Sequence, residues 1–252
     1  MMKKIITLIL TTLLSVSAYA QERIAIIGAM DVEIEALVPQ LKNKEDVTIA
    51  NHKFYQGELA GKPVVITKSG VGKVNTAITA TLLATKYDLK DIIFTGIAGA
   101  CSPEVEPMDV VISTALVQHD VDLTAFNRPK GLLPGYTSRE FLPGKALLKK
   151  AYQASISVLP NNKVHEGIIA SGDQFIASKQ KVSDIHKEFN AMAVEMEGAA
   201  LGQVAQKFKI PYIVIRTISD KADGSAEVTY SELKKATADN SAKITLALLK
   251  EL

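Results

Sequence analysis

Apolar runs that stop at acidic residues recur along this chain. Three of them, at residues 24–33, 193–202 and 212–220, read IAIIGAMDVE, AVEMEGAALG and YIVIRTISD. The apolar part of the third run has the composition of a buried strand, and an ionised carboxylate beside such a strand costs several kcal/mol unless it is paired or used. Because open α/β sheets bind ligands at their strand ends, the acids Glu33, Glu197 and Asp220 predict a site at the ends of several strands.

Strand-like and helix-like segments alternate from residue 23 onward. We predict strands at residues 23–27, 47–50, 54–58, 64–67, 91–95, 110–113, 164–170, 191–196 and 212–218. We predict helices at residues 31–41, 74–87, 145–157, 179–189 and 198–208, and a closing helix from a capping box at 229–232 to the C-terminus. This alternation favours an α/β layer fold with a mostly parallel sheet.

The bulk composition favours one domain over residues 21–252. The chain has 252 residues, of which 47% are hydrophobic, and it shows no low-complexity linker and no internal repeat. The net charge of +2 falls to 0 if Lys3 and Lys4 are removed, and a neutral chain without basic runs argues against nucleic acid as a partner. The single cysteine, Cys101, forms no internal disulfide and is interpreted as a small buried hydrophobe.

Residues 1–20 have the three-part pattern of a secretory signal peptide. The basic start MMKK precedes an apolar stretch at residues 5–16, and Ala18-Tyr19-Ala20 forms a small-x-small cleavage site. The apolar stretch is short for a membrane anchor, which takes roughly 20 residues, and no cysteine follows the site to carry a lipid. We therefore expect a periplasmic or secreted protein without membrane association after signal cleavage.

Two segments of small residues follow predicted strands. The segment at 70–73, GVGK, does not fit the phosphate-binding Walker pattern, because Thr67 and Val74 occupy positions that require Gly and Ser or Thr. A tight turn at 70–73 is therefore favoured over anion binding. The segment at 95–99, TGIAG, is expected to be a loop that brings a ligand close to backbone N–H groups.

The segment at 118–144 is rich in Pro and Gly, and a loop of this length usually has a function or meets a partner. It contains His119, Asp120 and Asp122, but no second histidine lies at metal-site spacing. We interpret these three as solvated loop residues and expect no metal and no cofactor.

Each of the three strand-end acids also has a structural explanation. Glu33 is explained equally by an exposed first helical turn, Glu197 by a helix N-terminus and Asp220 by a turn cap. Glu195 and Glu197 flank Met196, and the predicted strand-to-helix junction leaves open which of the two enters a site. The joint placement of Glu33, Glu197 and Asp220 at strand ends favours a functional site.

The ordered motifs IGAMDVE, KSGVGKVN, TGIAGA, HDVDLTAF, LPG, SGDQFI, AVEMEGAA and IVIRTISD run from residue 23 to the C-terminal region. This series resembles the 5′-methylthioadenosine/S-adenosylhomocysteine nucleosidases, which belong to the wider nucleoside phosphorylase family. The resemblance implies a three-layer α/β/α sandwich around a central mixed, mostly parallel sheet. It also implies a homodimer with shared active sites, an adenine nucleoside as the small-molecule substrate, and no metal or cofactor.

The resemblance implies a role for each residue that matches a motif. By that resemblance, Glu33 activates the attacking water, and Asp220, supported by Ser219, protonates or hydrogen-bonds N7 of the adenine. Glu197 holds the ribose hydroxyls, with Met196 against the sugar.

The same resemblance implies contacts to the base and to the 5′ group. Phe175 stacks on the base, the backbone of Ile176 reads its edge, and Val71 lines the pocket for the 5′-thio group. Residues that would close the neighbouring subunit's pocket are Leu123, Phe126 and Pro134.

These residue types suit the breaking of an N-glycosidic bond. The reaction passes through an oxocarbenium-like state, in which the water needs a base and the leaving purine needs a proton or a strong hydrogen bond. Because an ordinary Asp has a pKa of about 3.9, Asp220 needs burial or bound substrate to hold a proton at neutral pH.

Two features depart from the family pattern. Ile97 stands where a serine is common, which removes a hydroxyl near the sugar side of the site. Export is unusual because the family's usual substrates arise in the cytoplasm. The sequence does not rank methylthioadenosine, S-adenosylhomocysteine, 5′-deoxyadenosine and futalosine-type nucleosides.

Two alternative functions remain open from the sequence. A phosphorolytic purine nucleoside phosphorylase needs cations for phosphate, and Arg216 is the obvious cation in the motifs. A non-catalytic exported nucleoside-binding protein has no need to keep Glu33 and Asp220 together with Glu197.

We predict that the mature protein begins at Gln21. The reason is the basic start, the apolar core and the Ala18-Tyr19-Ala20 site. Intact-mass measurement on protein from the native host, combined with cell fractionation, checks it. A retained Met1 or recovery from the cytoplasm contradicts it.

Overall fold

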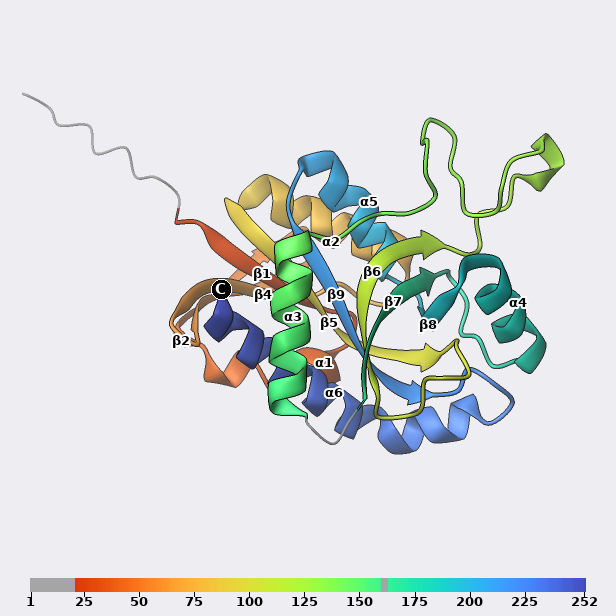
Figure 1. Ribbon diagram of the computed structural model, residues 1–252. Helices are drawn as coiled ribbons and strands as arrows, with labels where there is room; N and C mark the ends of the chain where they lie inside the picture. Colours follow the sequence, from red (N-terminus) through yellow and green to blue (C-terminus); the bar gives the residue numbers. More distant parts are fainter. Residues whose placement is uncertain (1–20, 160–162) are drawn as a thin grey trace, which may run out of the picture.

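A computed structural model describes residues 21–159 and 163–252, so the predicted signal peptide lies outside the described residues. The strands are β1 (Arg23–Gly28), β2 (Lys42–Ile49), β3 (His52–Leu59), β4 (Lys62–Lys68), β5 (Leu89–Ala100), β6 (Val110–Gln118), β7 (Val164–Ser171), β8 (Ala191–Glu195) and β9 (Tyr212–Asp220). The α-helices are α1 (Asp31–Ile34), α2 (Lys73–Lys86), α3 (Lys145–Val158), α4 (Lys179–Phe189), α5 (Gly198–Phe208) and α6 (Ala226–Glu251). Two short 3₁₀ helices, η1 (Val38–Gln40) and η2 (Thr124–Phe126), lie in connections (Figure 1).

The described strands form one mixed sheet in the order β2-β3-β4-β1-β5-β8-β7-β6-β9, with a further pairing between β5 and β9. The pairs β1–β4, β1–β5, β5–β9, β6–β7 and β7–β8 are parallel. The pairs β2–β3, β3–β4, β5–β8 and β6–β9 are antiparallel. The extra β5–β9 pairing closes β5, β8, β7, β6 and β9 into a ring, whereas β2 to β4 extend the sheet beyond β1.

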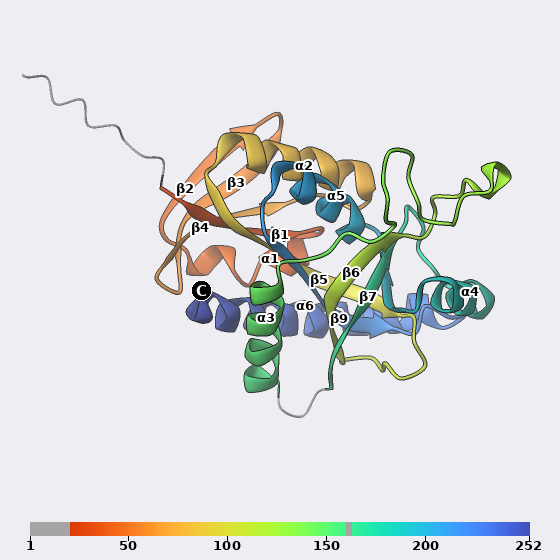
Figure 2. The ribbon, with the colours of Figure 1, turned by 45° about the horizontal axis from the view of Figure 1, so that its top comes forward.

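Helices cover both faces of the sheet. Successive residues of a strand point to opposite faces, so each face carries its own apolar side chains for helices to pack on. Ile24 and Ile26 of β1 pack in a cluster with α1, α3 and α6 residues, whereas Ala25 and Ile27 pack in a cluster with α2 and α5 residues. Figure 2 shows α2 and α5 on one side of the strands and α1, α3 and α6 on the other. The predicted three-layer α/β/α sandwich is confirmed.

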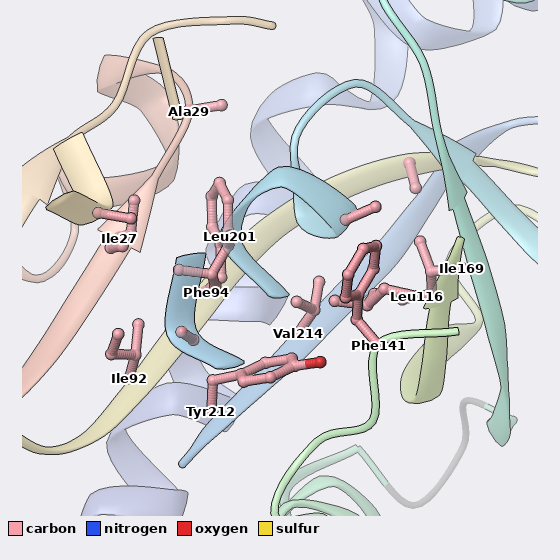
Figure 3. Packing of buried hydrophobic residues seen from close by; sticks show 14 of the residues in the cluster. Ile27, Ala29, Ile92, Phe94, Leu116, Phe141, Ile169, Leu201, Tyr212 and Val214 are labelled. Atoms are coloured by element: carbon pink, nitrogen blue, oxygen red, sulfur yellow. The ribbon is translucent and has the colours of Figure 1, made fainter. Parts of the chain in front are cut away.

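The core under α2 and α5 is continuous across the sheet. Phe94 of β5, Val214 of β9 and Leu201 of α5 are fully buried within it (Figure 3). A third cluster packs α4 against β6, β7 and β8 and contains Cys101, which is buried as predicted. Burial raises the pKa of the Cys101 thiol to about 12, so it remains a protonated apolar group at neutral pH.

Two predicted helices have different boundaries in the structure. The helix predicted at 31–41 ends at Ile34, and η1 follows it with Pro39 near its start, where the missing N–H and fixed φ interrupt an α-helix. The closing helix begins at Ala226, so the predicted capping box at 229–232 is wrong and lies inside the helix. Ser225 is the cap residue, and its hydroxyl donates to Asp223 instead of closing a capping box.

The expected loop at 95–99 is also wrong, because β5 continues without a break to Ala100. The small residues have a packing reason, because a Cβ at Gly96 would overlap Glu33 Oε1 and come within 2.7 Å of Arg216 Nη1. The small residues therefore let a strand, not a loop, pass close to buried charged side chains.

The connection between β6 and α3 is a long loop, as predicted. Figure 1 shows the part of it that contains η2 projecting away from the sandwich. None of the helices within residues 21–159 and 163–252 combines the length and apolar composition of a membrane span.

Candidate active site

A pocket with a cavity volume of about 160 Å³ lies where several strands end. Its walls come from the segments after β1, β4 and β7, from the C-terminal part of β5, and from the ends of β8 and β9. The predicted site residues that line it are Glu33, Val71, Phe175, Ile176, Met196, Glu197, Ser219 and Asp220.

Glu33 is 2% exposed and accepts three backbone hydrogen bonds. Its Oε2 accepts from the N–H groups of Ala29 and Met30 at 2.6 and 2.9 Å, and its Oε1 accepts from the N–H of Ile97 at 3.0 Å. The bond to Met30 also caps the short helix α1, so Glu33 is a first-turn acid, but the explanation as an exposed residue is wrong because its side chain is buried. Burial raises the pKa of Glu33, and Arg216 and the three N–H groups oppose that rise.

Glu195 and Glu197 both line the pocket, and Glu197 lies at the β8–α5 junction. Its Oε1 accepts a hydrogen bond of 2.9 Å from the N–H of Gly72, in the turn at 70–73. Gly70 and Gly72 have φ values of 83° and 100°, which glycine adopts readily. The predicted tight turn is confirmed, and its free N–H group serves the protein's own carboxylate. Burial, and then repulsion from Glu195, raises the pKa of Glu197 to about 8.

Asp220 ends β9 and is 2% exposed. Its Oδ2 accepts from the Ser219 hydroxyl at 2.7 Å and its Oδ1 accepts from the N–H of Ala222 at 2.7 Å. The turn-capping explanation therefore holds for one oxygen, while the side chain still lines the pocket. Burial raises the pKa of Asp220, and the Ser219 hydrogen bond opposes the rise.

Sequence reasoning gave no role to Glu195 and made Arg216 only a cation for a phosphate. Arg216 is 1% exposed, lies 2.6 Å from Glu195 Oε2 and 3.9 Å from Glu197 Oε2, and stacks over the ring of Phe94. Glu195 also accepts from the Ser171 hydroxyl and from the N–H of Gly198. A basic residue inside the apolar run at 212–218 was the signal of a buried ion pair, but it does not identify the acidic partner.

Two atoms of Arg216 are free for a further partner. Its Nε and Nη1 are buried without a hydrogen-bond partner among the described residues. Nη1 and Glu33 Oε1 both lie close to the position that a Cβ of Gly96 would take, so a donor and an acceptor meet behind the pocket wall.

The rest of the pocket is apolar and aromatic. Phe175, 52% exposed, meets Tyr230 edge-on with ring centroids 5.7 Å apart, and the Tyr230 hydroxyl lies 3.3 Å from the sulfur of Met30. Val71 and Met196 complete this wall, together with Ile97 in place of a hydroxyl-bearing residue. An apolar wall opposite a set of carboxylates suits a flat, partly apolar ligand that carries hydroxyl groups.

Leu123, Phe126 and Pro134 do not line this pocket. They lie in the projecting loop, where Phe126 is 75% exposed. Within one subunit the structure therefore leaves these three residues apart from the other predicted site residues.

No group of three or more His, Cys, Asp or Glu side chains in the described parts of the chain is arranged to hold a metal ion. Asp120 forms an ion pair with Lys73 instead, and His119 is half-buried beside Gly172. The interpretation of His119 and Asp120 as solvated loop residues is wrong, because neither side chain lies in open solvent.

Known proteins resemble this chain over most of its length. A sequence profile of the phosphorylase superfamily matches residues 23–252. A 5′-methylthioadenosine/S-adenosylhomocysteine nucleosidase from Exiguobacterium is 41% identical over 231 residues, covering 91% of this chain and 98% of the relative. The chain belongs to this nucleosidase family of the phosphorylase superfamily.

Solved structures of nucleosidases agree with the fold. The nucleosidase from Neisseria meningitidis, in complex with methylthio-immucillin-A, has a TM-score of 0.88 at 37% identity, covering 92% of this chain and 100% of that one. A futalosine hydrolase from Helicobacter pylori has a TM-score of 0.87 at 33% identity, covering 92% and 98%. The resemblance stated from the motifs is therefore confirmed.

The raised pKa of Glu197 predicts a stability that falls as pH rises. In the folded protein this carboxyl stays protonated up to about pH 8, whereas in the unfolded chain it ionises near its ordinary value. Stability from the protonated form is therefore lost as pH rises from about 4.5, the unfolded value, to about 8.

Urea unfolding of the wild type and of Glu197→Gln at several pH values checks this prediction. The variant keeps every other titrating group, so the difference between the two curves isolates Glu197. We expect the wild type to lose stability relative to the variant across this range. If the stabilities of the two proteins depend on pH in the same way, the raised pKa is wrongly assigned to Glu197.

Proposed function

We propose that this protein hydrolyses the N-glycosidic bond of 5′-methylthioadenosine, S-adenosylhomocysteine and related 5′-substituted adenosines. The products are adenine and the free 5-thio sugar. The observation that carries the proposal is the meeting of Glu33, Glu197 and Asp220 in one pocket with an aromatic wall. The family membership and the nucleoside-like inhibitor bound by the Neisseria meningitidis relative support the same reaction.

Glu33 is suited to activate water. Its carboxyl group lines the pocket, so a water molecule bound there has an acceptor for its proton. Water oxygen attacks C1′ of the ribose, and its proton passes to Glu33. Arg216 opposes the effect of burial on the pKa of Glu33 and so favours the ionised form that a base requires.

Asp220 is suited to serve the leaving purine. Breaking the bond from C1′ to N9 leaves negative charge on the base, and a proton or hydrogen bond at N7 neutralises it. Burial favours the protonated form of Asp220, while the Ser219 hydroxyl and the Ala222 N–H orient the carboxyl group. Phe175 and Ile176 would flank the base, and Glu197 and Met196 the sugar.

Phosphorolysis is not favoured, because the protein's own carboxylates occupy the donors that a phosphate would use. The N–H groups of Ala29, Met30 and Ile97 bind Glu33, and that of Gly72 binds Glu197. A phosphate dianion about 4 Å from Glu33 would meet repulsion of roughly 4 kcal/mol per unit charge at an effective dielectric of 20. A non-catalytic binding protein is not favoured because both proposed acid–base groups line the pocket.

We also propose an exported homodimer in which the loop at 119–135 completes the partner's pocket. The exposed side chain of Phe126 supports this arrangement. A groove lies between α2 and α5, and its apolar lining includes Val74, Val204 and Phe208. This groove supports the homodimer because it offers an apolar surface for a subunit contact. The signal-like residues 1–20 support export.

Glu33→Gln and Asp220→Asn should each lower kcat by 10²–10⁴-fold, because each removes a proposed proton-transfer group and keeps its shape. Adenine release in a continuous assay measures this. Glu35→Gln and Asp184→Asn, at exposed acids that do not line the pocket, are matched controls and should retain activity. Ordinary turnover in either site variant would mean that its role is misassigned.

Adenine release should proceed in phosphate-free buffer and yield the free 5-thio sugar, since water is the proposed acceptor. A panel of 5′-substituted adenosines, assayed with and without phosphate, tests this and ranks the 5′ groups. A strict phosphate requirement with a sugar 1-phosphate product would establish phosphorolysis. Tight nucleoside binding without adenine release would establish a binding protein.

Phe126→Ser should raise KM for methylthioadenosine while Ile156→Ser, a change at an exposed apolar residue on α3, should not. The physical reason is the loss of apolar contact with the 5′ group of the partner's ligand. Light scattering on both variants and the wild type reports the oligomeric state. A fully active monomer would refute the shared site.

A further inference from the structure

The turn at 70–73 ends in a lysine that the proposed chemistry leaves unused. Lys73 Nζ lies 2.6 Å from Asp120 Oδ1 and donates to Gln118 Oε1 at 3.1 Å. The side chains of Lys73 and Asp120 are only 18% and 16% exposed, so solvent screens this ion pair less than a surface pair. The pair joins the start of α2 to the end of β6.

Asp173 closes a cycle with this ion pair. Its Oδ1 accepts from the backbone N–H of Lys73 at 2.8 Å, and its own N–H donates to Asp120 Oδ2 at 3.0 Å. Burial opposes ionisation of Asp120, but the hydrogen bonds from Lys73 and Asp173 outweigh it and lower the pKa of Asp120. The cycle therefore keeps its charges at neutral pH and connects the segments 70–73, 118–120 and 172–175.

Two of these segments carry residues of the pocket, and we call them the Glu197 side and the Phe175 side. The turn at 70–73 carries Val71 and the N–H of Gly72 that binds Glu197, on the proposed ribose side. The segment after β7 carries Phe175, on the proposed base side. The third segment begins the projecting loop that contains Leu123 and Phe126.

We infer that Lys73, Asp120 and Asp173 are positioning residues that hold the Glu197 side and the Phe175 side of the pocket at a fixed separation. A nucleoside must fit both sides at once, so the cycle sets how well the empty pocket matches the ligand. The inference rests on the proposed function. It concerns binding more than proton transfer, because the hydrogen bonds of Glu33 and Asp220 involve none of these three residues.

The test separates positioning from a general loss of stability. Asp120→Asn keeps the shape of the side chain and removes its charge, and Lys73→Met removes the other partner. We expect KM for methylthioadenosine to rise about tenfold in each, as for a lost charged hydrogen bond, with kcat within about threefold of the wild type. Asp46→Asn, in the exposed Lys44–Asp46 pair on β2, is the matched control and should leave KM unchanged.

A double variant tests whether the two residues act as one unit. If they do, Lys73→Met combined with Asp120→Asn raises KM no further than the worse single variant. If the two single effects on KM multiply in the double variant, the residues act independently and the cycle is refuted. An unchanged KM, or a loss confined to kcat at an unchanged thermal midpoint, would overturn the inference.

Asp173→Ala provides a second route, since it removes the acceptor for the Lys73 N–H at an exposed position and the variant is expected to fold. If Asp120→Asn does not fold, the KM of Asp173→Ala decides the inference by the same criterion. Adenine release by the wild type in the same assay tests the proposed reaction separately. A wild type that releases no adenine refutes the reaction, whereas an active wild type with unchanged variants refutes only the positioning role.

Discussion

The buried guanidinium of Arg216 allows three glutamates to lie together inside an apolar sheet. An uncompensated buried carboxylate costs several kcal/mol, and removing one partner of a buried ion pair typically costs about 3–5 kcal/mol. Arg216 pairs directly with Glu195 and lies near Glu197 and Glu33, and the ring of Phe94 supports its flat face. Burial raises the pKa values of both Glu33 and Glu197, Arg216 opposes both rises, and the charges of Glu195 and Glu33 add to the rise at Glu197.

The fold supplies this arrangement by bringing strand ends together. β5 lies between β1, β8 and β9, so the segment after β1, the β8–α5 junction and the end of β9 all face its C-terminal part. Gly96 in β5 has no side chain, and the space that a Cβ would take is filled by Glu33 and Arg216. The close packing of the charges therefore depends on backbone position as much as on side-chain chemistry.

Much of this could be predicted from the sequence, because apolar runs mark buried strands and acids at their ends are costly without a purpose. The order of layers and the meeting of Glu33, Glu197 and Asp220 followed from that pattern. The pairing of Glu195 with Arg216 could not be predicted, since it joins two strands whose register depends on tertiary packing. The same holds for the strand through Gly96, whose sequence favours a loop until its neighbours are known. Local chemistry also misled at 31–41, where Pro39 outweighs the helical spacing of apolar residues.

The hydrogen bonds of Glu33 have a consequence for how such a site can change. Three N–H groups and the nearby Nη1 of Arg216 converge on the space that one carboxylate occupies. Shortening that side chain would leave a cavity lined with donors, which is the form of an oxyanion receptor. A hydrolytic pocket of this design thus contains the outline of an anion site within it, filled by its own base. In this scaffold the carboxyl group of Glu33, and not an external anion, occupies these donors.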